Sequence, residues 1–149
     1  MRIIGRIFLS IIFIIFGGSS IANWDVAYTD LDAAIVNWQM YKGNIQAVGS
    51  LLDVLTGYIQ FLLGLGIFLQ VMGGLMVFFG YKVKIGALFL SLYMVGSTLI
   101  YFPFWFYEGE QMTYNLVLFL KNVSIFGGIL LLFGAVPKRT NQVIFNDEL

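Results

Sequence analysis

Of all the residues in this sequence, a lysine inside an apolar stretch is the one best suited to a binding or chemical role. Lys121 lies in the apolar run of residues 114–136, about four residues, or roughly 6 Å, from the middle of that run. A charged side chain at such a depth costs at least about 2.5–3.5 kcal/mol on insertion scales, so it usually faces the interior of a helix bundle and pairs there. Lys121 would then orient the polar headgroup of a ligand or lock the bundle. The alternative is that its ammonium group extends outward to the membrane surface.

Three further polar side chains accompany Lys121. Asn122 follows it directly, and Gln70 lies near the middle of the apolar run 58–80. Both amides donate and accept hydrogen bonds, so they could join Lys121 across helices without adding charge, although a simple interhelical hydrogen bond is the plainer interpretation of Gln70. Arg6, in the first run, is expected to extend to cytoplasmic lipid headgroups. We predict that Lys121, Asn122, Gln70 and Arg6 form the polar cluster of the chain, for ligand binding or for helix packing.

The residue types that are missing exclude several kinds of chemistry. The chain has no Cys and no His, which removes thiolate nucleophiles, disulfides, Cys/His zinc sites and the usual imidazole base. No acidic residue lies deep in an apolar run, which disfavours a proton relay and ion-driven transport. We predict no catalytic residue, no metal site and no resident cofactor. A quinone or a lipid is the ligand that an apolar groove with a few donors would accept.

Four transmembrane helices must position these residues. Of the 149 residues, 60% are hydrophobic and 11% are charged, and the mean hydropathy is +0.90, whereas ordinary soluble domains carry about 25% charged residues. Apolar runs of the length that crosses a bilayer cover residues 3–22, 58–80, 85–106 and 114–136. The sequence therefore predicts an all-α integral membrane protein with a single domain over residues 1–149. Its fold would be a four-transmembrane-helix bundle with an outer amphipathic helical segment in the connection 23–57.

The first apolar run also resembles a secretory signal peptide. Arg2 and Arg6 precede an apolar stretch that ends in Ser20, Ile21 and Ala22, a pattern similar to a cleavage site. The stretch is long for a signal peptide and has the right length for a span. We therefore expect a retained helix.

The distribution of charge predicts the orientation of the chain. Eight basic and eight acidic residues give a formal net charge of zero, which offers no field for nucleic acid. If the N-terminus is cytoplasmic, the inner side receives six basic residues: Arg2, Arg6, Lys82, Lys84, Lys138 and Arg139. The outer connections receive one basic residue, Lys42, and six acidic ones: Asp25, Asp30, Asp32, Asp53, Glu108 and Glu110. The positive-inside rule then predicts a multi-pass protein with both termini in the cytoplasm.

The connection 23–57 is predicted to contain two short helices. Asp30 is suited to N-cap the first of them. The apolar residues that follow recur at helical spacing: Leu31, Ala34, Ile35 and Trp38. After a break at Gly43 and Asn44, a second apolar face comprises Val48, Leu51, Leu52 and Leu55. We interpret the segment as a lid lying in the outer membrane interface, with a gate over a ligand site as the alternative.

Small residues recur at spacings that favour close packing of helices. They are Gly66, Gly73 and Gly80 in the second run, Ser10 and Gly17 in the first, and Gly127 with Gly134 and Ser124 with Gly128 in the fourth. Because lipid tails supply no hydrophobic drive between helices, close backbone approach must drive their association. The pattern predicts a compact bundle.

Four stretches of the chain together form a family pattern: residues 6–10 with Gly17 and Gly18, residues 70–80, residues 92–95 leading to 102–105, and residues 119–122 with 127–130. In these stretches the sequence resembles the DoxX family of small bacterial membrane proteins, which implies a location in the bacterial inner membrane. The last of these stretches is the most specific. The family often has an acid where this chain has Gln70 and a His where it has Phe102, so roles attached to those two side chains do not carry over. The resemblance implies an association with quinone oxidoreductase subunits or with redox-protective membrane complexes.

The leading hypothesis is therefore a non-catalytic subunit or scaffold of a redox or quinone-associated membrane assembly. Its partners would be the lipid bilayer and either a redox protein or further copies of the chain. The alternatives are a carrier of small solutes or lipids, for which a polar cavity lined by Lys121 and Gln70 is expected, and a purely structural membrane assembly protein. An enzyme that acts alone is the least favoured class.

Overall fold

A computed structural model describes residues 2–41 and 46–134, which are helical throughout apart from short connections. The helices are α1 (Arg2–Ala22), α2 (Trp24–Tyr41), α3 (Gln46–Gly57), α4 (Ile59–Phe79), α5 (Val83–Tyr101), the 3₁₀ turn η1 (Phe104–Phe106) and α6 (Gly109–Gly134). The predicted break at Gly43 and Asn44 lies outside the described residues, as do Lys42, Lys138 and Arg139. The expected all-helical fold class is confirmed.

Four of these helices are long and apolar enough to cross a membrane. The candidate spans are Ile3–Ala22, Ile59–Phe79, Val83–Phe106 and Gly109–Gly134. They confirm the four predicted spans, with one sizeable difference: α6 begins at Gly109, five residues before the predicted start. Hydropathy marks only the apolar part of a helix, whereas the backbone of α6 already winds through the polar residues that precede Tyr114.

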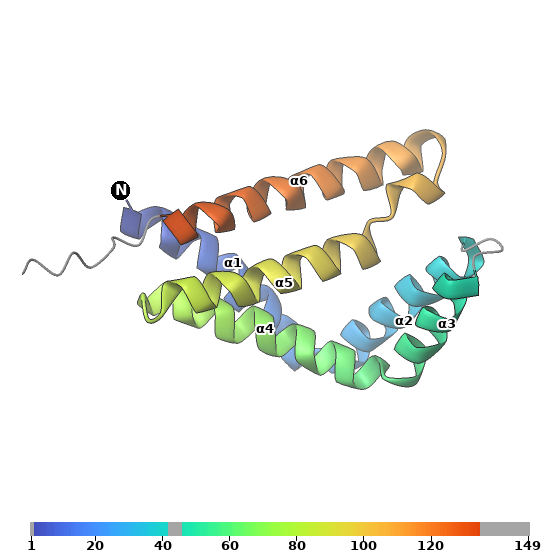
Figure 1. The fold of residues 1–149 in the computed structure, drawn as a ribbon, viewed down its shortest axis with the longest axis horizontal. Helices are drawn as coiled ribbons and strands as arrows, with labels where there is room; N and C mark the ends of the chain where they lie inside the picture. Colours follow the sequence, from blue (N-terminus) through green and yellow to red (C-terminus); the bar gives the residue numbers. More distant parts are fainter. Residues whose placement is uncertain (1, 42–45, 135–149) are drawn as a thin grey trace, which may run out of the picture.

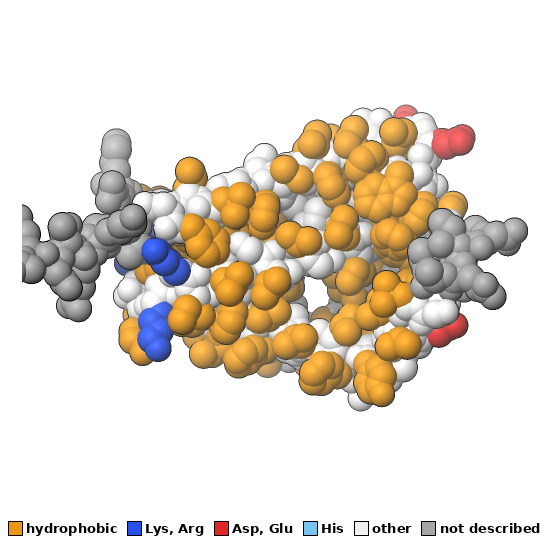
Figure 2. Space-filling model, in the orientation of Figure 1, with side chains coloured by type: hydrophobic (Ala, Val, Ile, Leu, Met, Phe, Trp, Pro, Cys, Tyr) orange, Lys and Arg blue, Asp and Glu red, His pale blue; other side chains and the backbone are white. Residues whose placement is uncertain are grey.

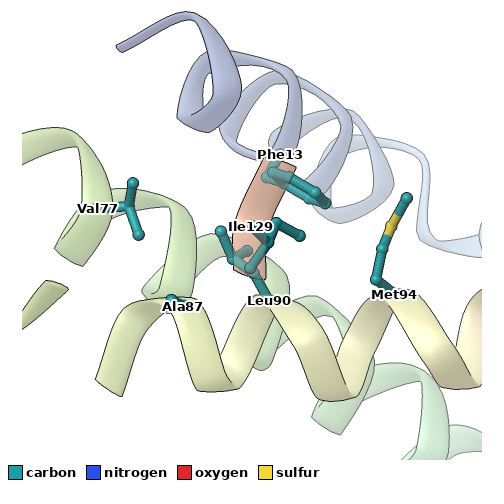
Figure 3. Packing of buried hydrophobic residues seen from close by; sticks show 6 residues of the cluster. All are labelled: Phe13, Val77, Ala87, Leu90, Met94 and Ile129. Atoms are coloured by element: carbon teal, nitrogen blue, oxygen red, sulfur yellow. The ribbon is translucent and has the colours of Figure 1, made fainter. Parts of the chain in front are cut away.

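The four long helices pack side by side in the order α1, α4, α5, α6, and α1 also contacts α6 (Figure 1). The main core lies between them. Its buried residues are Phe13, Val77, Ala87, Leu90, Met94 and Ile129, contributed by all four helices (Figure 3). Burial of Phe13 and Ser10 makes α1 an integral part of the bundle.

The two shorter helices α2 and α3 form a hairpin at one end of the bundle (Figure 1). A second core joins this hairpin to α4. Its buried residues are Leu31, Ile35, Leu52, Ile59, Leu63 and Ile67, with Ile100 and Tyr101 of α5 packed against them. The predicted apolar face of the first short helix is confirmed at Leu31 and Ile35. In the second, Leu52 is buried but Leu51 is 59% exposed.

The prediction that Asp30 begins a helix is wrong. Helix α2 starts at Trp24, and Asp30 lies in its interior. The backbone continues almost without interruption from α1, because the N–H of Asn23 donates to the carbonyl of Ser19 and the N–H of Ala27 donates to that of Asn23. With neither Gly nor Pro between residues 23 and 30, nothing in the sequence stops helix growth there.

Small residues permit close helix contacts at two of the predicted positions and at two others. A Cβ atom added at Gly73 of α4 would lie 3.0 Å from the backbone oxygen of Gly86 in α5. A Cβ atom at Gly17 of α1 would lie 2.5 Å from Cγ2 of Val71, and one at Gly74 would lie 3.0 Å from Cγ1 of Ile14. These contacts hold α1 and α5 against α4, as expected for helices that associate in lipid.

Among the described residues, none makes a tight contact with the glycines of α6 that the sequence predicts as packing positions. A Cβ atom added at Gly127 or at Gly134 would have no heavy atom within 4 Å. Gly128 faces Leu9 of α1, but only at an ordinary van der Waals distance of 3.6 Å. The glycine spacing in α6 thus lies on a surface that the described residues leave uncovered.

Charged side chains are concentrated at opposite ends of the molecule. Figure 2 shows lysine and arginine at the end that carries the turn between α4 and α5, and acidic side chains at the other end. We call them the basic end, with Lys82 and Lys84, and the acidic end, with Glu108 and Glu110. The long surface between them is dominated by hydrophobic side chains (Figure 2), which is the surface that a bilayer requires.

Candidate functional site

Gln70 is enclosed between α1 and α4. Its side chain is 4% exposed, and a Cβ atom added at Gly17 would lie 3.5 Å from its Cδ. The interhelical hydrogen bond expected for this amide is not formed with any described residue. Gln70 therefore contributes to the tight contact between α1 and α4, at the middle of α4.

Arg6 lies over the C-terminal end of α4. A Cβ atom at Gly80, the left-handed residue that ends this helix (φ 76°), would lie 2.8 Å from Nη2 of Arg6. The guanidinium is thus positioned beside the carbonyl end of a helix, where positive charge is favourable. Its Nε atom is buried and has no hydrogen-bond partner among the described residues. The described residues place Arg6 against the end of α4, and its expected contact with lipid headgroups stays a prediction.

Asn122 lines a narrow groove between α5 and α6. The groove has a volume of about 120 Å³ and is otherwise mainly apolar, with Thr98 and Met94 on one side and Phe119 and Phe126 on the other. Pockets for drug-sized ligands are typically about 300–1,000 Å³. The groove therefore has room for a single side chain or a short stretch of acyl chain.

Lys121 is exposed on the surface of α6, which differs from the interior position that its depth in the span suggests. It is placed at the middle of the helix, with twelve residues from Gly109 before it and thirteen to Gly134 after it. Among the described residues, none forms a hydrogen bond or an ion pair with it. An ammonium group at the middle of a span, with no partner among the described residues, either extends to the membrane surface or favours a partner from outside those residues.

The four predicted site residues do not form one cluster. Gln70 and Arg6 both lie between α1 and α4 but at different levels, Asn122 faces the groove with α5, and Lys121 faces outward. The two helices that carry Gln70 and Lys121 are not among the pairs that pack closely. A cavity lined by Lys121 and Gln70 is expected for a carrier, but neither residue lines the groove between α5 and α6 or the pocket beside Gly109 and Val117.

Sequence reasoning missed an aromatic cluster at the acidic end. We define the aromatic cap as Trp38 and Tyr41 of α2 with Trp105, Phe106 and Tyr107 of the connection between α5 and α6. The ring centroids of Trp38 and Phe106 are 4.8 Å apart, and those of Tyr41 and Phe106 are 5.1 Å apart. Trp38 falls on the apolar face predicted for the connection 23–57, but no sequence pattern indicated that this segment meets residues 105–107.

Two hydrogen bonds reinforce the aromatic cap. The indole Nε1 of Trp38 donates to the backbone oxygen of Ile100, 3.2 Å away, and the amide of Asn37 donates to the hydroxyl of Tyr107. Pro103 has no N–H and ends α5 just beyond Ile100. The indole thereby satisfies one of the carbonyls that the end of a helix leaves without a partner.

The fold and its surface define a multi-pass helical membrane protein with four candidate spans. Among the described residues, no group of three or more His, Cys, Asp or Glu side chains is arranged to hold a metal ion. The DoxX family matches residues 1–106, more than two thirds of the chain. The protein therefore belongs to the DoxX family. No curated protein and no solved structure matches it.

The family match confirms the resemblance and covers three of the four stretches that carry it. It extends from α1 to the end of η1 and stops before α6. Residues 119–130, which carry the most specific part of the resemblance, lie outside it. What Lys121 and Asn122 do must consequently be argued from this chain itself.

Proposed function

We propose that this protein is a non-catalytic subunit or scaffold of a redox or quinone-associated assembly in the bacterial inner membrane. The observation that carries the proposal is the open surface of α6. Of the residues in this helix, Ile129 alone is buried, whereas α4 has seven buried residues. A span that the described residues cover so little, with a lysine at its middle that has no partner among them, is suited to binding another component.

The redox and quinone part of the proposal rests on family membership. The family model matches this chain from α1 to η1, and membership implies a quinone or redox partner. The groove beside Asn122 supports contact with an apolar chain that carries few polar atoms. A quinone tail or a lipid acyl chain has that chemistry.

The direct test is to isolate the full chain from its native membranes in a mild detergent. Extracted quinones would be quantified and co-purifying proteins identified by mass spectrometry. We expect stoichiometric quinone or a defined redox subunit with the wild type, and a loss of about tenfold with Lys121→Met, in line with the energies of polar contacts between membrane helices. Lys84→Met, at an exposed lysine of the basic end, is the matched control and should retain the component. Recovery of bare protein, with Lys121→Met harmless to assembly, would contradict the proposal.

The proposed orientation places the basic end and both termini in the cytoplasm. It is supported by Lys82 and Lys84 at one end and by Glu108 and Glu110 at the other. Because the chain contains no cysteine, a single introduced thiol reports its own side unambiguously. In intact cells, a membrane-impermeant maleimide should label Glu110→Cys, whereas Lys84→Cys should react only after permeabilisation. The reverse labelling pattern would invert the topology.

A further inference from the structure

The outward side of α6 presents one continuous face along the span. Helical spacings of three and four residues align six exposed positions on it, which we call the α6 face: Val117, Lys121, Ser124, Gly127, Leu131 and Gly134. The face contains a single charged residue, Lys121, and three small ones. It lies away from the groove with α5, which Phe119 and Asn122 line from the opposite side of the helix.

The α6 face permits the backbone of another helix to approach closely. At Gly73 and Gly86, where α4 and α5 meet, the neighbouring helix leaves no space for a side chain. On the α6 face, by contrast, added Cβ atoms at Gly127 and Gly134 would meet no atom within 4 Å. Close approach of backbones is what stabilises helix pairs in lipid, so this space fits a helix from outside the chain.

The charge of Lys121 on the α6 face indicates what kind of helix would bind there. Six acidic residues are described in this chain, Asp25, Asp30, Asp32, Asp53, Glu108 and Glu110, and all of them precede α6 or lie in its first turn. None of them forms an ion pair with Lys121, which lies about 18 Å from the start of α6 at 1.5 Å per residue. A second copy paired through the same face would bring two lysines together, and like charges repel.

We propose that the α6 face binds a transmembrane helix of a different protein, and that this helix carries one carboxyl side chain near the bilayer centre. The carboxylate would pair with Lys121 in a medium of low dielectric constant, while the partner backbone packs on Ser124 and Gly127. This inference rests on the proposed subunit role, and it specifies the chemistry of the partner.

The inference is tested with a synthetic probe. The full-length protein, labelled through Glu110→Cys, is reconstituted in phosphatidylcholine vesicles with a leucine-rich transmembrane peptide that has one central Glu, Gln or Leu. Association is measured by energy transfer. We expect the wild type to bind the Glu peptide about tenfold more tightly than the Gln peptide, because polar contacts between membrane helices contribute about 1–2 kcal/mol.

Two pairs of variants separate charge from packing. Lys121→Met should abolish the preference for Glu, and Lys84→Met should retain it. Gly127→Leu should weaken binding of all three peptides, whereas Gly96→Leu, at an equally open glycine of α5, should not. Equal binding of the Glu and Gln peptides by the wild type would overturn the inference. Efficient formation of disulfide-linked homodimers by Ser124→Cys in native membranes would also overturn it, because a second copy of the chain would then cover the α6 face.

The peptide experiment and the co-purification experiment can fail independently of each other. If a quinone or redox component co-purifies with the wild type but the peptides show no preference for Glu, the subunit role stands and the α6 face is not its docking surface. If the protein is recovered bare, the subunit role fails whatever the peptides show.

Discussion

Replacing Gly86 by alanine is expected to lower the free energy of unfolding by about 1–3 kcal/mol, the cost of inserting a methyl group into a packed core. The added Cβ would lie 2.8 Å from Cβ of Met76 and 3.0 Å from the backbone oxygen of Gly73. Neither atom is the free end of a flexible side chain. Helices α4 and α5 would therefore have to move apart along their contact, which the rest of the main core resists.

Titration of dodecyl sulfate into mild-detergent micelles, followed by circular dichroism, measures this change. Gly96→Ala is the matched control, because Gly96 is in the same helix and has no atom within 4 Å of its Cβ position. Alanine favours a helix over glycine by up to about 1 kcal/mol, so the control should leave stability unchanged or raise it slightly. Similar shifts for both variants would show that α4 and α5 are not in close contact at Gly86.

The four spans could be predicted from the sequence because length and apolarity are local properties of a segment. The runs 3–22 and 58–80 agree with the structure to within a residue at each end. Contacts between helices are not local. No small residue recurs at helical spacing from Gly86 within α5, so the sequence of this helix does not mark Gly86 as a packing position. Its contact, Gly73, belongs to a different helix, α4.

The candidate site shows the same limit. The depth of Lys121 follows from counting along the run, but the direction in which it faces depends on how α5 and α1 pack against α6. Those contacts involve other sides of α6, with Ile129 turned inward, and Lys121 is left outside. Gln70, in contrast, lies where its neighbours Gly73 and Gly74 suggest, in the most closely packed part of the bundle.

Removal of the indole at position 38 should detach the α2–α3 hairpin from the end of the bundle. Trp38→Ala deletes the ring contacts with Trp105 and Phe106 and the hydrogen bond to Ile100. For a half-buried tryptophan, we expect a loss of about 3 kcal/mol, the lower limit of the range for Trp→Ala. The backbone amides of α2 and α3 should then exchange hydrogen for deuterium about 100-fold faster, while those of α4 stay protected.

Two further variants divide this effect into its parts. Trp38→Phe retains an aromatic ring but leaves the carbonyl of Ile100 without its donor, which should cost about 1 kcal/mol. Met40→Ala alters a side chain of the same helix that is 70% exposed, so it should leave the exchange of the hairpin unchanged. If Trp38→Ala behaved like Met40→Ala, the hairpin would be held by its second core alone. The expected order, with Trp38→Phe between the other two, requires that ring packing and carbonyl capping at the end of α5 both hold the hairpin in place.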